Sequence, residues 1–256
     1  MHFSANSLRP CAGGGVRSMT RLAEYRIEAE SSDWGSMTTT HAPPPSQPPA
    51  DATSAARAAV ATSRIKRGLD LLAALAALLV FLPLLLTIGL IVRMETPGPA
   101  LFRQRRTGLG GQVFTVFKFR TMTVAEDGDV IRQATRGDAR LTSVGKVLRK
   151  FSLDELPQVL NVLRGEMSLI GPRPHALAHD ETWSKLVPGY ARRFRARPGL
   201  SGYAQVCGYR GEVTDLASLR ARVEADNEYI DTWSPLLDLK ILLRTLPLIL
   251  SDTRAY

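Results

Sequence analysis

Residues 71–92 read LLAALAALLVFLPLLLTIGLIV and contain no charged side chain. At a helical rise of about 1.5 Å per residue, a helix of this length reaches about 33 Å, which is enough to cross the hydrocarbon core of a bilayer. A buried core helix is the alternative, but core helices are usually shorter and carry some charge. The sequence therefore predicts a membrane helix over about residues 69–92.

The flanks of this helix indicate how it enters the membrane. Basic residues stand on both sides of it: Arg64, Lys66, Arg67, Arg93, Arg103, Arg105 and Arg106. Cationic flanks favour the cytoplasmic side, and here both flanks qualify. Pro83 removes one backbone hydrogen bond and favours a kink. We expect a bent, re-entrant helix with both ends on one face, and a simple span is the alternative.

The rest of the chain divides into a tail and a globular part. Residues 1–60 contain glycine, serine and proline runs without an apolar period, so we predict a disordered N-terminal tail. Residues 93–256 have a globular pattern, which makes 61–256 one domain. Within it, residues 236–250 are apolar but include Asp238, Lys240 and Arg244, which is typical of an interfacial or core-packed helix.

The charge balance favours anionic partners. Lys and Arg number 33 against 24 Asp and Glu, a net charge of +9. Phosphate headgroups, nucleotides and nucleic acid all suit such a charge. The basic stretches lack regular aromatic interleaving and any nucleic-acid motif, so we expect no nucleic-acid partner.

Two segments of the globular part have clear local patterns. Gly108 to Gly111 predict a turn, and residues 112–122 alternate as a strand does, which would bring Lys118 and Arg120 to one side. Residues 144–163 are mostly helical by pattern, with an interruption around 152–157.

Asp154 and Glu155 lie in this interruption. Ser152 and Glu155 have the spacing of a capping box, whereas Pro157 would suit the first position of a slightly later helix. An acidic first helical turn is common and needs no function. The alternative is chemical: one carboxylate attacks a phosphorus atom, and its neighbour holds a divalent cation.

Several cations could bind phosphate beside these carboxylates. They are Lys118, Arg120, Arg149 and Arg173. Arginine binds phosphate in a forked geometry. Basic residues scattered over a solvated face are the ordinary explanation, and we apply it to Lys150 and to several arginines of 192–197. Arg173, fixed between Pro172 and Pro174, is harder to explain in that way.

Taken in order, these segments resemble the bacterial sugar transferase family of small monotopic polyprenyl-phosphate phosphoglycosyl transferases. The matching motifs are Lys66-Arg67-x-x-Asp70, Lys118-Phe119-Arg120-Thr121-Met122, Ser152-Leu153-Asp154-Glu155-Leu156-Pro157-Gln158, Gly171-Pro172-Arg173-Pro174, Arg197-Pro198-Gly199 and Ala204-Gln205-Val206. Together they run over about residues 64–256, and the set is far more specific than any one motif.

The resemblance implies an α/β, helix-rich fold: a re-entrant membrane helix attached to a small cytoplasmic catalytic domain, residues 93–256, with interfacial helices and a short sheet. It also implies a location at the cytoplasmic face of the inner membrane. The reaction would move a sugar-1-phosphate from a UDP-sugar to undecaprenyl phosphate. Asp154 would be the nucleophile and Glu155 the Mg²⁺ ligand, with Lys118, Arg120, Arg149 and Arg173 as phosphate contacts.

The branch that handles glucose- or galactose-1-phosphate for exopolysaccharide synthesis is the most similar. The family pattern there has an amide where this chain has Cys207 and an indole where it has Tyr203, which leaves the sugar open. Two alternatives remain. One is a membrane-tethered basic scaffold protein, and the other is an inactive relative that acts in polysaccharide assembly. Homo-oligomer formation is also left open.

Overall fold

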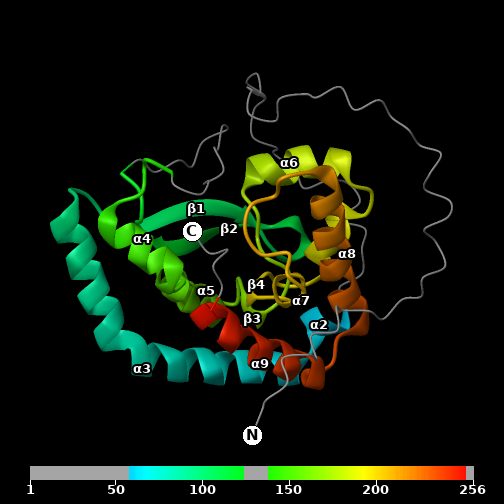
Figure 1. Ribbon diagram of the computed structural model, residues 1–256. Helices are drawn as coiled ribbons and strands as arrows, with labels where there is room; N and C mark the ends of the chain where they lie inside the picture. Colours follow the sequence, from blue (N-terminus) through cyan, green and yellow to red (C-terminus); the bar gives the residue numbers. More distant parts are fainter. Residues whose placement is uncertain (1–57, 124–137, 252–256) are drawn as a thin grey trace, which may run out of the picture. The chain divides into compact units, whose positions relative to one another are not determined.

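The computed structural model describes residues 58–123 and 138–251 (Figure 1). The predicted disordered tail lies outside the described residues except for its last positions. There, the short helix α2 spans Ala59–Thr62, and Ala58 and Val60 are buried. The described chain therefore begins in a packed segment a few residues before the predicted domain boundary.

Helix α3, Arg64–Glu95, contains the apolar stretch and is longer than predicted at both ends. Ser63 caps it by accepting a hydrogen bond from the backbone nitrogen of Lys66. Pro83 lies inside the helix, and Figure 1 shows α3 bending along its length. Only 11% of the most apolar 18-residue stretch of α3 is buried. Helix α3 is therefore a candidate membrane helix and does not fit the core-helix alternative.

A β-hairpin follows α3; its turn and second strand were predicted from the sequence, and its first strand was not. Strands β1, Leu101–Thr107, and β2, Val113–Phe119, pair antiparallel with Arg103 opposite Phe117. The 3-10 helix η1, Leu109–Gly111, makes the turn, where Gly110 has a positive φ of 65°. Strand β2 ends at Phe119, earlier than predicted. Arg120 therefore lies beyond the strand, and the alternation that predicted Lys118 and Arg120 on one side does not extend to it.

The predicted broken helix is confirmed as three pieces. They are α4, Ser143–Lys150, the 3-10 helix η2, Leu153–Gln158, and α5, Val159–Arg164. Asn161 is fully buried on α5. Its side chain donates to the Thr115 carbonyl at 2.7 Å and accepts from the Phe117 nitrogen at 3.1 Å. These bonds fix α5, and therefore the end of η2, against strand β2.

A second small sheet brings two glycine-containing motifs together. Strands β3, Ser168–Ile170, and β4, Gly199–Ser201, pair in parallel. A Cβ atom added to Gly171 would lie 2.3 Å from the Arg197 carbonyl oxygen, closer than any side chain permits. The turn at 171–174 therefore packs backbone to backbone against the 197–199 segment, and glycine makes this approach possible.

The remaining elements surround these sheets. They are α6, Leu177–Leu186, the 3-10 helix η3, Tyr190–Arg195, α7, Tyr203–Val206, α8, Leu216–Thr232, and α9, Pro235–Ser251. Trp183 of α6, Phe194 of η3 and Val223 of α8 share one buried cluster. The described part is thus helix-rich with two two-stranded sheets, which confirms the helical α/β class in its coarse form.

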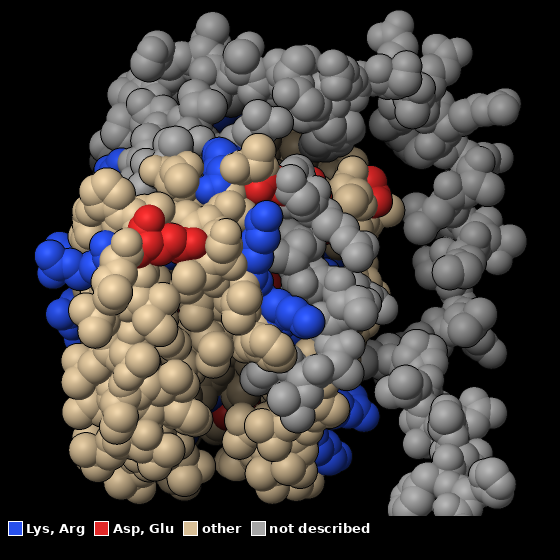
Figure 2. Space-filling view, turned by 60° about the vertical axis from the view of Figure 1, so that its left-hand side comes forward, with Lys and Arg blue, Asp and Glu red and all other residues tan. Residues whose placement is uncertain are grey.

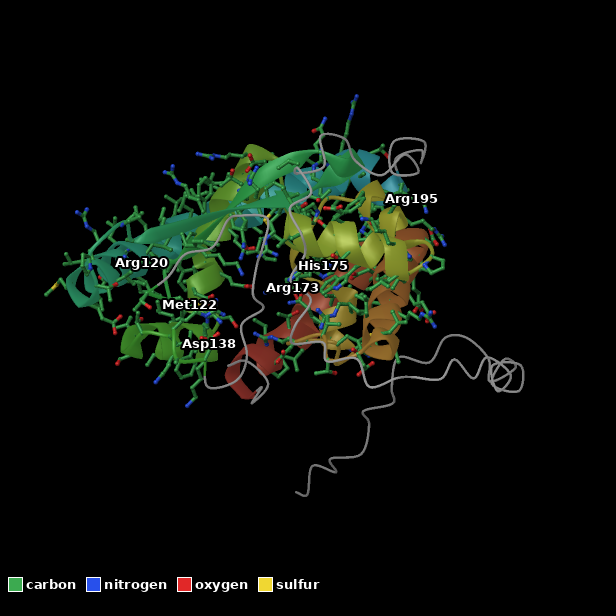
Figure 3. The ribbon with its side chains drawn as sticks, turned by 90° about the horizontal axis from the view of Figure 1, so that it is seen from above. Arg120, Met122, Asp138, Arg173, His175 and Arg195 are labelled. Carbon is green, nitrogen blue, oxygen red and sulfur yellow. The ribbon has the colours of Figure 1, made fainter. Side chains whose placement is uncertain are left out.

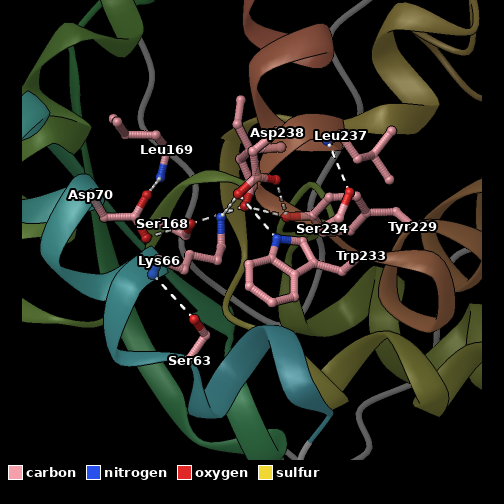
Figure 4. Close-up of polar contacts among 11 residues, drawn as sticks. Ser63, Lys66, Asp70, Ser168, Leu169, Tyr229, Trp233, Ser234, Leu237 and Asp238 are labelled. Carbon is pink, nitrogen blue, oxygen red and sulfur yellow. Dashed lines mark hydrogen bonds and ion pairs between the residues drawn. The ribbon is translucent and has the colours of Figure 1, made fainter.

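Helix α9 is fixed to the start of α3 by a buried polar cluster (Figure 4). Lys66 of α3 donates to Asp238 of α9 at 2.7 Å, and only 6% of the Lys66 side chain is exposed. Tyr229 and Trp233 donate to the same carboxylate, at 2.8 and 3.1 Å. Both carboxylate oxygens of Asp238 therefore accept hydrogen bonds, and the Lys66–Asp238 ion pair links α3 to α9.

The outer surfaces of α3 and α9 are apolar. On α3 they include Leu72, Leu79, Val80, Leu86 and Leu90, and on α9 they include Leu236, Leu239, Leu243 and Leu246. In Figure 2 the lower left of the molecular face is uncharged, and Lys and Arg lie above it and at the lower right. An exposed apolar surface of this kind beneath a basic one is typical of attachment to a membrane.

Candidate active site

Asp154 and Glu155 lie in the first turn of η2, between α4 and α5. The predicted capping box does not form. Ser152 has a left-handed backbone, φ 55° and ψ 23°, and its side chain makes no cap hydrogen bond to η2. The hydroxyl instead accepts a hydrogen bond from Arg210 at 2.5 Å. Of the two alternatives from the sequence, the capping box is absent because a residue distant in sequence supplies the partner of Ser152. Pro157, the other candidate helix start, lies inside η2.

Glu155 is held by two cations. Lys118 of β2 donates to its carboxylate at 2.7 Å, and Arg173 donates through both terminal nitrogens, at 2.5 and 3.1 Å. Burial by itself would raise the pKa of Glu155, but Arg173 and Lys118 outweigh burial and hold this pKa well below its ordinary value. Glu155 is therefore ionised at neutral pH.

Asp154 has different surroundings. The residue is buried, with 8% of its surface exposed. Among the described residues, Glu155 is the carboxylate that makes the ion pairs of this site. Burial and the adjacent charge of Glu155 raise the pKa of Asp154 to about 6, while Lys118, Arg149 and Arg173 act in the opposite direction. This carboxylate is ionised at neutral pH and is not held by the strong bonds that occupy its neighbour.

Three of the four predicted phosphate contacts therefore gather around the two carboxylates. Lys118 and Arg173 bind Glu155, and Arg149 lies near enough to lower the pKa of Asp154. Arg149 also donates to the Thr121 hydroxyl at 3.0 Å, which fixes its position at the end of α4. Converging cations beside a carboxylate suit the chemistry of phosphoryl groups.

Arg120, the fourth, is placed elsewhere. Its guanidinium donates to the Thr96 carbonyl at 2.6 Å and also contacts the carbonyls of Val92, Pro97 and Gly98 at the end of α3. Figure 3 shows Arg120 well apart from Arg173 and His175. In this position Arg120 caps the carboxyl end of α3, where a positive charge is favourable.

Comparison of the chain with known proteins identifies its family. The family description "Bacterial sugar transferase" matches residues 61–252. This chain belongs to the bacterial sugar transferase family. The resemblance drawn from the sequence motifs is therefore confirmed.

Individual members of the bacterial sugar transferase family are closely similar. The chain is 55% identical over 197 residues to a UDP-glucose:undecaprenyl-phosphate glucose-1-phosphate transferase of Caulobacter vibrioides, which covers 77% of this chain and 74% of that protein. A protein of the same name from Escherichia coli is 48% identical, but the match covers only 39% of its length. The exopolysaccharide production protein PSS of Rhizobium leguminosarum is 41% identical, with 92% of its length covered.

The residues of this transferase site can be tested against the predicted Mg²⁺ ion. Within residues 58–123 and 138–251, no group of three His, Cys, Asp or Glu side chains is arranged to hold a metal. Magnesium is commonly bound by one or two protein carboxylates together with substrate phosphates, so such a group is not required. Glu155 fits this mode as the single protein carboxylate, provided that phosphates take over the bonds that Lys118 and Arg173 now make to it.

A buried polar network that was not predicted from the sequence lies behind Arg173. Arg193 of η3 donates to the Arg173 carbonyl at 2.6 Å, to Asp226 at 2.8 Å and to His175 at 2.9 Å. His175 is also hydrogen-bonded to Tyr190 at 2.6 Å, and Tyr190 in turn donates to Asp180 at 2.5 Å. The residues are far apart in sequence, and the arginine-rich run 192–197 looked like a solvated face. Arg193 instead braces the backbone that carries Arg173.

Proposed function

We propose that this protein transfers glucose-1-phosphate from UDP-glucose to undecaprenyl phosphate, as the first membrane step of exopolysaccharide or related glycan synthesis. The observation that carries the proposal is the Asp154 carboxylate, which lies among Lys118, Arg149 and Arg173 while Glu155 makes the ion pairs. The names of the Caulobacter and Escherichia coli relatives support the donor and the lipid. Galactose is the second candidate sugar.

In the first step Asp154 attacks the β-phosphorus of the nucleotide sugar. A bond forms between a carboxylate oxygen and phosphorus, the bond from phosphorus to the bridging oxygen breaks, and UMP leaves. The sugar-phosphate is then attached to Asp154. Lys118, Arg149 and Arg173 bind the phosphate oxygens. They offset the repulsion between the Asp154 carboxylate and the negatively charged phosphates of the donor.

In the second step an oxygen of the lipid phosphate attacks the same phosphorus. The bond between Asp154 and phosphorus breaks, the carboxylate is regenerated, and the lipid carries a diphosphate linked to the sugar. Bound Mg²⁺, held by Glu155 and the phosphates, would neutralise phosphate charge and orient the donor. The buried setting of Asp154 keeps water from competing with the lipid for the intermediate.

The lipid partner requires a membrane location, and α3 supports a re-entrant arrangement at the cytoplasmic face. Near its start, Asp70 accepts hydrogen bonds from the Ser168 hydroxyl and the Leu169 nitrogen. Near its end, Glu95 accepts from the Val144 nitrogen. Both ends of the helix thus contact the same globular part, which a straight helix crossing a bilayer would not allow.

The experiment is a transfer assay with purified full-length protein in detergent, labelled UDP-glucose or UDP-galactose, Mg²⁺ and undecaprenyl phosphate. UMP release and label in the lipid fraction are measured. We expect turnover with the wild type and a loss of several orders of magnitude in Asp154→Asn. Asp231→Asn, which removes a half-exposed surface carboxylate of α8, is the matched control and should keep wild-type turnover.

Two outcomes would reject the proposal. Absence of turnover with every UDP-sugar would favour the scaffold or inactive relative. Equal rates for wild type and Asp154→Asn would remove Asp154 as the nucleophile. Mass spectrometry of protein incubated with donor but without lipid should detect a sugar-phosphate adduct in the wild type and none in Asp154→Asn.

A further inference from the structure

Ser152 joins α4 to the turn of Asp154 in a backbone conformation that side chains seldom adopt. Its φ is 55°, and every other residue with positive φ in the described part of the chain is glycine. A side chain in this left-handed region meets its own backbone, so the conformation is unfavourable unless the surroundings enforce it. The strain stands two residues before the proposed nucleophile.

Arg210 provides the enforcing contact. It lies between α7 and α8, and its Nη2 donates to the Ser152 hydroxyl at 2.5 Å. A hydrogen bond from a charged donor is stronger than a neutral one. The loop is anchored by the Gly211 carbonyl, which accepts from Arg222 of α8 at 2.9 Å. Gly208 and Gly211, on either side of Arg210, have φ of 94° and 97°, which glycine adopts freely.

The conformation of Ser152 sets the start of the catalytic turn. Its carbonyl accepts a hydrogen bond from the Glu155 nitrogen at 3.3 Å, and its nitrogen donates to the Arg149 carbonyl at 3.0 Å. If Ser152 relaxed to a more common conformation, both bonds would change. Asp154 would then leave its place among Lys118, Arg149 and Arg173.

We propose that Arg210 is a positioning residue, which holds the Asp154 turn in its reactive conformation by restraining Ser152. The proposal rests on the proposed transfer reaction. It differs from a role for Arg210 in binding phosphate, because the effect passes through the Ser152 backbone. A substitution that removes the strain should therefore remove the need for Arg210.

Ser152→Gly and Ser152→Ala form a matched pair for this test. Both lose the hydroxyl that Arg210 binds, but glycine adopts positive φ freely and alanine does not. We expect Ser152→Gly to keep nearly the wild-type kcat and Ser152→Ala to lose about tenfold, the scale of one lost charged hydrogen bond. The KM for UDP-glucose should stay unchanged in both variants, because no substrate contact is removed.

The decisive experiment combines these changes with Arg210→Met. In the wild-type background Arg210→Met should lower kcat about tenfold, and in the Ser152→Gly background it should cause no further loss. Arg210→Lys, which keeps a cationic donor, should recover part of the loss. Equal losses in both backgrounds, or a raised KM with unchanged kcat, would overturn the proposal in favour of a direct substrate contact.

Controls separate this inference from the reaction itself. Arg192→Met removes an exposed arginine of η3 that pairs with Asp231, and it should leave kcat unchanged. Thermal unfolding of each variant identifies losses that come from misfolding. If the wild type has no turnover, the proposed function fails. If the wild type turns over and Arg210→Met matches it, only the positioning role fails.

Discussion

Asp154 and Glu155 are neighbours in the chain, yet the structure gives their carboxyl groups opposite electrostatic surroundings. Arg173 and Lys118 hold the pKa of Glu155 well below its ordinary value, whereas burial raises that of Asp154 to about 6. Pairs of titratable groups driven apart in this way commonly divide the chemical roles of a site. Here the division favours Glu155 as the permanently charged partner and Asp154 as the group that reacts.

The raised pKa of Asp154 predicts the pH dependence of the reaction. A nucleophilic carboxylate must be ionised, and a raised pKa means that Asp154 becomes protonated as the pH falls through about 6. We expect kcat/KM for UMP release to fall below that pH. Lys118→Met removes a cation that favours the ionised form, so the fall should begin at a higher pH. An activity that stays constant down to pH 4.5 in the wild type would contradict the raised pKa of Asp154.

The separate positions of Arg120 and Arg173 predict different losses on substitution. Arg120→Met should mainly destabilise the end of α3, by about 1.5–3 kcal/mol, because charged hydrogen bonds to buried carbonyls are lost. Arg173→Met should mainly lower turnover. Thermal unfolding and kcat of the folded fraction distinguish the two. A folded Arg120→Met protein with a large loss of kcat would return Arg120 to the list of phosphate contacts.

The sequence predicted the chemistry of single residues better than their positions. Lys118 lies on a strand, as alternation predicted, and it donates to Glu155. Arg120 does not share its side, because β2 ends at Phe119. Ser152 and Glu155 had the spacing of a capping box, yet Ser152 is drawn into a left-handed conformation beside Arg210. Local spacing contains no information about a partner nearly sixty residues away.

Helices α3 and α9 have complementary roles, because each presents an apolar outer surface and they share one buried ion pair. Lys66 and Asp238 are both largely shielded from solvent, and Tyr229 and Trp233 donate further hydrogen bonds to the Asp238 carboxylate. A buried charge without its partner is strongly unfavourable. This contact therefore fixes the membrane helix to the neighbouring helix at a defined place.

A double-mutant cycle tests this connection between the helices. Asp238→Asn keeps only one of the two acceptor oxygens and leaves Lys66 buried without a counter-charge, so it should destabilise the protein by about 3–5 kcal/mol. Lys66→Met combined with Asp238→Asn removes the unpaired charge and should recover part of the loss. Thermal unfolding in detergent measures each variant. A double variant less stable than Asp238→Asn would show that the ion pair is not what links the helices.

Elements that depend on local patterns were predicted well from the sequence. The apolar run corresponds to α3, the glycine turn and the alternating residues after it correspond to η1 and β2, and the interrupted helix corresponds to α4–η2–α5. Strand β1 was not predicted. The β3–β4 sheet was not predicted, because it joins two three-residue strands that are about thirty positions apart. Such short strands have no period of their own. Backbone hydrogen bonds from Ser168 to Pro198 and from Gly171 to Ser201 hold them, and glycine at 171 permits the close approach.

The described globular part contacts both halves of α3, which bears on how the protein sits in a membrane. Ala74 in the first half packs with Phe114 and Val162, and Val92 in the second half packs with Phe119 and Leu148. A straight helix of 32 residues would be about 48 Å long, so its ends could not both reach one small domain without a bend. Pro83 provides a physical cause for that bend.

The re-entrant arrangement predicts that both ends of α3 lie on the cytoplasmic side. Reporter fusions to the two termini of the full chain measure this: a fluorescent protein that matures only in the cytoplasm should be bright at both ends, and alkaline phosphatase should be inactive at both. Pro83→Leu restores the missing backbone donor while keeping the apolar length, so a fraction of molecules should straighten and span. Leu82→Ala, which keeps the proline, should leave the topology unchanged. Active phosphatase at the N-terminus of the wild type would establish a span and would require a different route for the lipid to reach Asp154.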